Sequence, residues 1–147
     1  MRIPNATGTQ CAQLCRDFPQ LFRHTQDISL PVGWIDLVRE LAREMHTEAD
    51  RSRIQPRILQ IREKFAGLRV SVAGGNDEIE RLVKEVNERS FKTCANCGSG
   101  EDVRLRLARN GWRYTVCDNC VIMQALAGES DSFEIVPPDD DEFPRSR

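Results

Sequence analysis

Two Cys-x-x-Cys pairs, separated by nineteen residues, constrain the fold of this chain more than any other feature. Cys94 and Cys97 form the first pair, and Cys117 and Cys120 form the second. Two intervening residues let one tight turn direct both sulfur atoms at a single ion, and two such pairs are typical of a four-thiolate zinc ribbon. Two disulfides, or four buried free thiols, are the alternative. We predict one structural zinc ion held by Cys94, Cys97, Cys117 and Cys120.

The segment between the two pairs predicts a β-hairpin. Residues 103–107 and 112–116 alternate in polarity, and Asn110-Gly111 is the dipeptide preferred in a two-residue type I′ turn. This turn would place Leu107 opposite Tyr114 and gather the apolar side chains on one face. That face would contain Leu105, Leu107, Trp112, Tyr114 and Val116, and the opposite face Arg104, Arg106, Arg113 and Thr115.

The predicted face with Arg104, Arg106 and Arg113 suggests contact with an anion or a nucleic acid. A solvated outer face of a two-sided hairpin is the interpretation we favour, because three arginines are few for a nucleic-acid footprint.

Length and composition indicate one compact domain, or one domain with a small appended module. The chain has 147 residues, of which 39% are apolar, so it can bury a core. We expect an α+β main body over residues 1–90, the zinc ribbon over residues 91–128 and a tail over residues 129–147.

The tail carries seven acidic and two basic side chains and is expected to be mostly disordered. We favour solubility as its role over a docking strand at residues 133–136 or a charge mimic that competes for a basic partner. The rest of the chain is only mildly basic, which argues against a strong electrostatic trap for nucleic acid.

The body should contain three helices and a second hairpin. We expect helices over residues 9–23, with Thr9 as cap and an interruption at Pro19, over residues 31–48, and over residues 76–90, with Asn76 as cap. Residues 57–72 predict a hairpin that places Leu59, Ile61 and Phe65 on the side of Leu68, Val70 and Val72; a helix through residues 57–65 is the alternative.

The two remaining cysteines, Cys11 and Cys15, lie one helical turn apart. They could hold a second metal ion together with His24, but buried packing is the more frequent role of such cysteines.

The sequence offers little for catalysis. His24 and His46 form no His-Glu-x-x-His motif, and no phosphate-binding glycine loop or nucleophile elbow is present. We therefore expect no enzymatic activity and no small-molecule substrate. A hydrolase built on Asp36, Glu40 and Glu44 is the alternative, although carboxylates at this spacing among arginines usually form a solvated face.

The chain should be cytoplasmic. Its N-terminus has no apolar run typical of a signal peptide, and no stretch is long enough to span a bilayer. Cysteines at metal-ligand spacing also suit a reducing compartment.

Several motifs occur together along this chain: Phe-Pro-x-Leu-Phe at residues 18–22, Gly33-Trp34, the stretch over residues 62–69, and the ribbon with Cys97-Gly98, Gly111-Trp112 and the last cysteine pair. In this combination the chain resembles a group of small, uncharacterised phage and prophage proteins with a C-terminal four-cysteine zinc ribbon. The resemblance implies a phage-type accessory protein, and the four cysteines are the residues that it carries over.

We therefore expect a non-enzymatic, zinc-binding interaction protein of phage type that binds and modulates a host or phage protein. A regulator that binds nucleic acid through the arginine face is the alternative.

Overall fold

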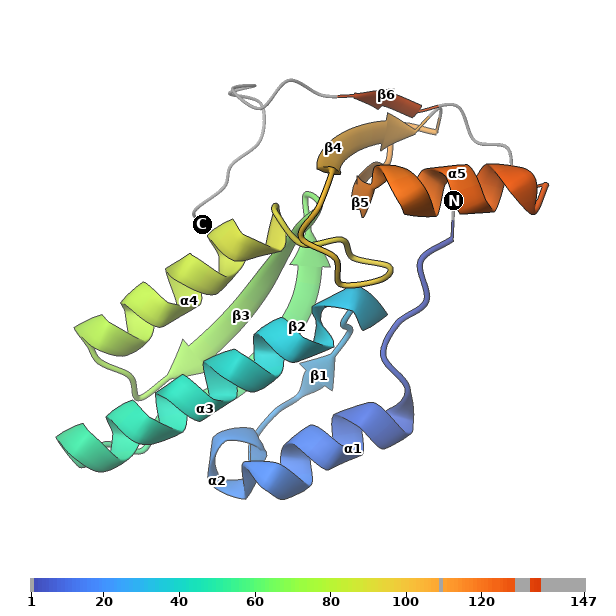
Figure 1. Cartoon of the computed structure of the whole chain (residues 1–147). Helices are drawn as coiled ribbons and strands as arrows, with labels where there is room; N and C mark the ends of the chain where they lie inside the picture. The colour runs from blue at the N-terminus through green and yellow to red at the C-terminus, as the bar shows by residue number, and fades with distance from the viewer. Residues whose placement is uncertain (1, 109, 129–132, 136–147) are drawn as a thin grey trace.

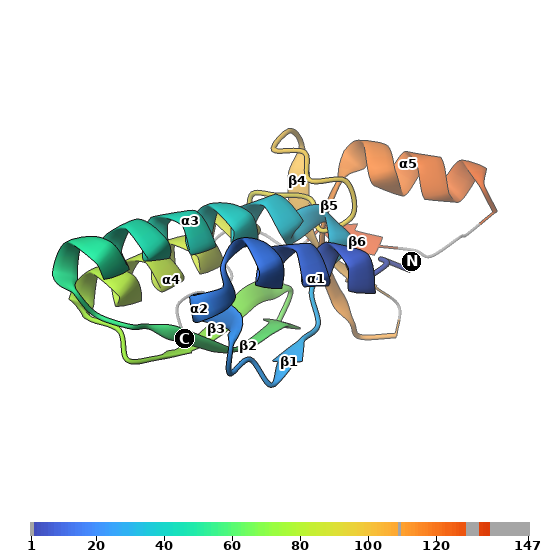
Figure 2. The same ribbon diagram turned by 90° about the horizontal axis from the view of Figure 1, so that it is seen from below.

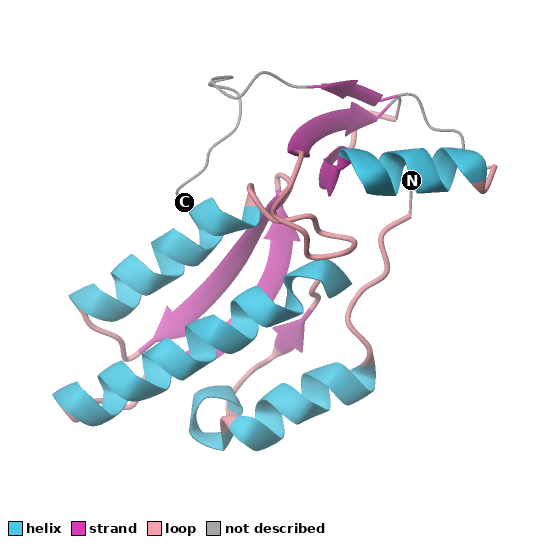
Figure 3. Cartoon of the chain, viewed as in Figure 1, coloured by secondary structure: helices cyan, strands magenta, loops and turns pink. Residues whose placement is uncertain are grey.

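The structure is a computed structural model that describes residues 2–108 and 110–128, and the backbone of residues 133–135. It combines helices and strands, as predicted for the α+β class (Figures 1 and 3). The helices are α1 (Gly8–Asp17), α2 (Pro19–Phe22), α3 (Ile35–Ser52), α4 (Asp77–Ser90) and α5 (Asp118–Leu126), and a 3-10 turn, η1, spans Val32–Trp34. The strands are β1 (Asp27–Ile28), β2 (Arg57–Lys64), β3 (Gly67–Ala73), β4 (Val103–Ala108), β5 (Arg113–Cys117) and β6 (Phe133–Ile135).

The main body is a three-stranded sheet with helices on one face. The strand order is β1-β2-β3, with β1 parallel and β3 antiparallel to β2. Figure 2 shows α3 and α4 side by side over the sheet. The core between these layers contains Leu37, Leu41, Met45, Ile58, Ile61, Leu68, Ile79, Leu82 and Val86. This packing explains the apolar stripes at helical spacing in both helices.

The helix expected over residues 9–23 is interrupted at Pro19 as predicted, but its start differs. Helix α1 begins earlier, because Thr7 and not Thr9 is its cap; the Thr7 side chain accepts from the Gln10 backbone and the Gln10 side chain accepts from the Thr7 backbone. Pro19 then begins the separate helix α2. The helix expected over residues 31–48 is preceded by η1 and extends to Ser52. Asn76 caps α4 as predicted, since its Oδ1 accepts from the Ile79 N–H.

The β2–β3 hairpin forms, so the helix considered over residues 57–65 is wrong. Its turn is Phe65-Ala66, with φ of 53° and 65°, which is typical of a type I′ turn. A β-bulge after Ile58 shifts the register, so Ile58 and Ile61 enter the core. The prediction that Leu59 and Phe65 share the core face is wrong: Leu59 is half-buried at the bulge and Phe65 is exposed in the turn.

A second sheet, ordered β5-β4-β6, carries the cysteine-rich region. The β4–β5 register is shifted by one residue from our prediction: Leu107 pairs with Arg113, not Tyr114. The loop has three positions instead of two, because the Ala108 N–H bonds to the Trp112 carbonyl oxygen and Gly111 has a φ of 88°. A shift of one residue moves every side chain of one strand to the opposite face.

Strand β6 pairs antiparallel with β4 and lies within the segment expected to be a disordered tail. The three residues of β6, Phe133–Ile135, pair through their backbone with the chain's own hairpin. Residues 129–132 and 136–147, which contain the acidic run of the predicted tail, lie outside the described residues.

Candidate metal centre

The four predicted ligands converge in the structure. The sulfur atoms of Cys94, Cys97, Cys117 and Cys120 all lie within 4.8 Å of one another, and this group could hold a metal ion. Cys94 and Cys97 lie in the loop that follows α4, whereas Cys117 ends β5 and Cys120 lies in the first turn of α5. The hairpin thus returns the second pair to the first.

Two separations between sulfur atoms match those around one tetrahedral ion, and all the others lie within 4.8 Å. The Cys94 and Cys120 sulfurs are 3.8 Å apart, and the Cys97 and Cys117 sulfurs are 3.7 Å apart. Zinc–sulfur bonds of about 2.3 Å in a tetrahedron place sulfur atoms about 3.8 Å apart. A disulfide would bring two sulfurs to about 2.05 Å, and all four cysteines are free thiols here. The geometry therefore favours metal ligation over the two-disulfide alternative.

Hydrogen bonds from N–H groups surround the sulfurs. The Cys94 sulfur accepts from the backbone N–H of Cys97 at 3.5 Å and of Cys117 at 3.3 Å. The Cys117 sulfur accepts from the Cys120 N–H at 3.4 Å, and the Cys120 sulfur accepts from the Asn96 side-chain amide at 3.3 Å. Such donors stabilise sulfur in its anionic form and orient it. Asn96 was not singled out in the sequence, although its place inside the first Cys-x-x-Cys pair was a usable signal.

The protonation of these thiols depends on burial and on those donors. Burial raises the pKa of Cys94, but the backbone hydrogen bonds together lower it by more, so the pKa lies below its ordinary value. Burial raises the pKa of Cys97, and it raises the pKa of Cys120 to about 12. Four thiolates this close together repel one another, so a cation is the group that could stabilise them together.

The loop of the first pair sits directly on η1 of the main body. The Gly33 N–H donates to the Ala95 carbonyl oxygen at 2.8 Å, and the indole Nε1 of the fully buried Trp34 donates to the Thr93 carbonyl oxygen at 2.8 Å. Gly98 has a φ of 81°, and a Cβ there would lie 3.1 Å from the Gly33 carbonyl oxygen. Gly33 and Gly98 are thus explained by the close approach of two backbones.

The hairpin is also tied to the main body through Thr115. Its hydroxyl donates to the Ala66 carbonyl oxygen at 2.8 Å in the β2–β3 turn, and its side chain is buried. Our placement of Thr115 on a solvated arginine face is therefore wrong, and the shifted register is the reason.

The predicted arginine face does not form. Arg113 lies on the opposite side of the hairpin from Arg104 and Arg106, because it pairs with Leu107. Arg106 is only 6% exposed and binds Asp118, which also pairs with Arg104 at 3.0 Å. Asp118 was missed as a functional partner, although an acidic residue directly after Cys117 at a helix start was a signal for it. The guanidinium groups lower the pKa of Asp118, Arg104 having the larger effect.

Other candidate site residues are not brought together. Among the described residues, the four-cysteine group is the only metal-ligating cluster, and it does not include Cys11, Cys15 or His24. Cys11 and Cys15 are half-buried, and burial raises the pKa of both thiols. Of the acidic residues considered for a hydrolase, Asp36, Glu40 and Glu44, Glu40 forms an ion pair with Arg89 at 2.8 Å.

Comparisons with family models, curated proteins and solved structures found no match for this chain. None of the helices in the part of the chain that the structure describes is long and apolar enough to cross a membrane. What the metal centre does is therefore inferred from its own geometry.

Proposed function

We propose that Cys94, Cys97, Cys117 and Cys120 hold one structural zinc ion as the centre of a zinc ribbon. The observation that carries this proposal is the distance between sulfurs of different Cys-x-x-Cys pairs. It is 3.8 Å from Cys94 to Cys120 and 3.7 Å from Cys97 to Cys117, as in a tetrahedral four-thiolate site. The soft thiolate set and the tetrahedral spacing both favour zinc over magnesium or calcium, which bind oxygen ligands.

The role of this ion is to join the hairpin to the main body. Four protein ligands leave no open position for water or substrate, so the site suits structure and not catalysis. The loop that supplies Cys94 and Cys97 contacts η1 through Gly33 and Trp34. A metal bound there fixes both the ribbon and the surface of the body around it.

We propose that the protein is a non-enzymatic, phage-type interaction protein that binds and modulates a host or phage protein in the cytoplasm. The support is the closed metal site together with surfaces on the sheet and on α5 that the described residues leave uncovered. Ile122, Met123 and Leu126 of α5 are more than half exposed, as expected where a partner can pack.

The position of the arginines favours protein binding over the alternative of a nucleic-acid regulator. Phosphate contacts need accessible cations, whereas Arg106 is buried against Asp118 and Arg113 lies on the other side of the hairpin. Asp118 pairs with both arginines and offsets one of their two positive charges, which further reduces the charge that this face offers.

The test is affinity capture of partners from host lysate, with and without nuclease treatment, on protein whose zinc content has been measured. The proposal expects protein to be retained equally in both cases. Retention that depends on nucleic acid would support the regulator, and protein capture that survives complete metal loss would separate partner binding from the zinc site.

A further inference from the structure

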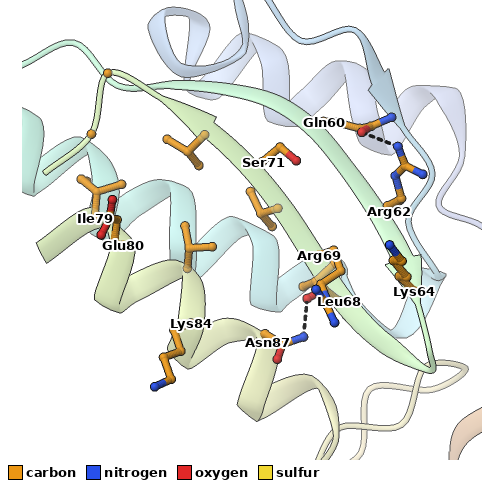
Figure 4. Close-up of a pocket in the computed structure, with 15 residues that line it drawn as sticks. Gln60, Arg62, Lys64, Leu68, Arg69, Ser71, Ile79, Glu80, Lys84 and Asn87 are labelled. Carbon is orange, nitrogen blue, oxygen red and sulfur yellow. Dashed lines mark hydrogen bonds between the residues drawn. The ribbon is translucent and has the colours of Figure 1, made fainter. Parts of the chain in front are cut away.

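A groove of about 850 Å³ runs along β3, outside the metal centre (Figure 4). One wall is α4, which contributes Ile79, Val83 and Lys84, and the other is the sheet. β3 is the last strand of its sheet on this side, within the described residues. An open strand edge beside an apolar helix wall can accept another extended chain.

The backbone of β3 is open at two residues. Leu68 directs its N–H and C=O away from β2, since the N–H donates to Ser90 at 2.9 Å and the C=O accepts from Asn87 at 2.9 Å. Backbone direction alternates along an antiparallel strand, so Val70 and Val72 also direct their N–H and C=O groups outward. No hydrogen bond joins these four groups to another described residue. A strand of about four or five residues would satisfy them.

The two sides of this edge differ in chemistry. On the inner side, Val70 and Val72 lie near Ile79 and Val83. The remaining charged groups of the groove are four cations and one carboxylate: Arg62, Lys64, Arg69, Lys84 and Glu80. Arg62 and Arg69 are cross-strand partners on the outer face of the sheet, and Arg62 donates to the neutral Gln60 amide at 2.6 Å.

We propose that this groove binds an extended segment of a partner protein in which acidic and apolar residues alternate. The segment adds to β3 as a fourth strand, bonded through the backbone of Val70 and Val72. Its side chains alternate between the two faces, so apolar residues enter the Ile79 and Val83 wall while acidic residues meet the cations of the outer face. The inference deepens the proposed protein-binding function, on which it rests, by assigning its surface.

Two competing roles for the groove have different consequences. Charged residues beside an edge strand can serve only to prevent edge-to-edge pairing, in which case no peptide binds. A cationic groove can also hold the phosphate backbone of a nucleic acid, which does not require the outward backbone groups of β3.

The test uses the zinc-loaded full chain and a fluorescein-labelled decapeptide of alternating glutamate and valine. Fluorescence anisotropy measures affinity, and amide exchange measures protection of the Val70 and Val72 N–H groups. We expect saturable binding that protects both amides. Methylating the peptide nitrogens on the edge that faces β3 should weaken binding about tenfold or more, since two or more hydrogen bonds are lost. This arm leaves the protein unchanged and so cannot fail through misfolding.

A matched pair of variants tests the charge. Arg62→Glu with Lys64→Glu replaces two exposed cations on the outer face of β2 and should weaken peptide binding about tenfold, because two attractions become repulsions. Arg23→Glu with Arg43→Glu changes net charge equally on exposed residues outside the groove and should have little effect. Equal loss in both pairs, or binding that is insensitive to N-methylation, would overturn the proposal, as would preferential binding of a labelled oligonucleotide to the groove. Binding only after deletion of residues 136–147 would assign the groove to the chain's own acidic segment instead. If the Arg62 and Lys64 variant captures lysate protein normally, the protein-binding function stands and this surface for it is wrong.

Discussion

Gly33 and Ala95 join the main body to the metal-binding loop through a 2.8 Å hydrogen bond from the Gly33 N–H to the Ala95 carbonyl oxygen. A Cβ on Gly33 would lie 2.2 Å from the Cys94 carbonyl oxygen and 2.5 Å from the Ala95 carbonyl carbon. Both neighbours are backbone atoms of the loop that positions two ligands, so they cannot move without moving the site.

Gly33→Ala should therefore destabilise the protein by about 2–4 kcal/mol and weaken metal retention against a chelator. Gly8→Ala is the matched control, because a Cβ at Gly8 would have no neighbour within 4 Å and alanine is the better helix former. Chemical denaturation of both variants measures the difference. Equal stability of the two variants would show that the loop does not rest on η1.

Arg106→Glu should unfold the hairpin and not merely change its surface. The substitution places a carboxylate at a 6% exposed position beside Asp118. Breaking a buried pair typically costs about 3–5 kcal/mol, and the cost here should lie near the lower end because Asp118 is 39% exposed. Arg104→Glu, at a side chain 43% exposed, should cost about 1 kcal/mol or less. The free energies of unfolding from denaturant titration check this order. A small effect of Arg106→Glu would show that the Arg106 side chain is solvated and not buried against Asp118.

The junction between α3 and α4 should make stability depend on acidic pH. Hydrogen bonds from Ser52, Asn76 and Arg51, in that order of effect, lower the pKa of Glu48 to about 2 from an ordinary value of 4.5. The ionised form is favoured in the folded state, so its contribution is present above pH 4.5 and is lost as the pH falls toward 2.

Thermal unfolding followed between pH 6 and pH 2 tests this prediction. Glu48→Gln should have a lower melting temperature at pH 6 and a shallower decline through the acidic range than the unmodified protein. Glu44→Gln, one turn earlier and exposed, should retain the full decline. If Glu48→Gln shows the same slope as the unmodified protein, Glu48 is not the group that titrates.

Loss of the metal should affect the molecule unevenly. The core around Cys94, Val116, Cys117 and Cys120 is separate from the larger core between α3, α4 and the sheet. Structural zinc contributes roughly 10 kcal/mol or more of apparent folding free energy in small modules. Cys117→Ser should therefore remove amide-exchange protection from residues 94–120 and weaken it in Val32–Trp34.

Cys117→Ser should leave amide-exchange protection in α3 and α4, whose apolar faces share one core. Leu41→Asp and Leu82→Asp should instead unfold the main body, because burying each apolar side chain contributes about 1.5–3 kcal/mol. Loss of protection throughout residues 10–90 in Cys117→Ser would mean that body and ribbon form one cooperative unit.

The sequence was sufficient where local chemistry decides the structure. The Cys-x-x-Cys spacing located all four converging sulfurs, and Asn76 with the acidic residues after it located the start of α4. Sequence-based prediction failed where the pairing register of two strands depends on tertiary contacts. Asn110-Gly111 suits a two-residue turn, yet the loop takes three positions, and this shift buries Arg106 and separates it from Arg113. The bulge after Ile58 had the same effect on Leu59.

Pairing between distant segments was also beyond local patterns. β1 has two residues and β6 three, and both form only because a longer strand offers an edge to them. Asp118 pairs with two arginines because of the observed β4–β5 register. The register predicted from the sequence was shifted by one residue from the observed one.

X-ray absorption at the zinc edge, combined with elemental analysis of protein purified after metal-replete expression, tests the central proposal most directly. The four-cysteine site predicts one zinc ion per chain with four sulfur ligands at about 2.3 Å and no oxygen or nitrogen ligand. Cys11→Ser with Cys15→Ser should leave that stoichiometry and spectrum unchanged. Absence of zinc, or a coordination shell with fewer than four sulfurs, would contradict the closed structural site.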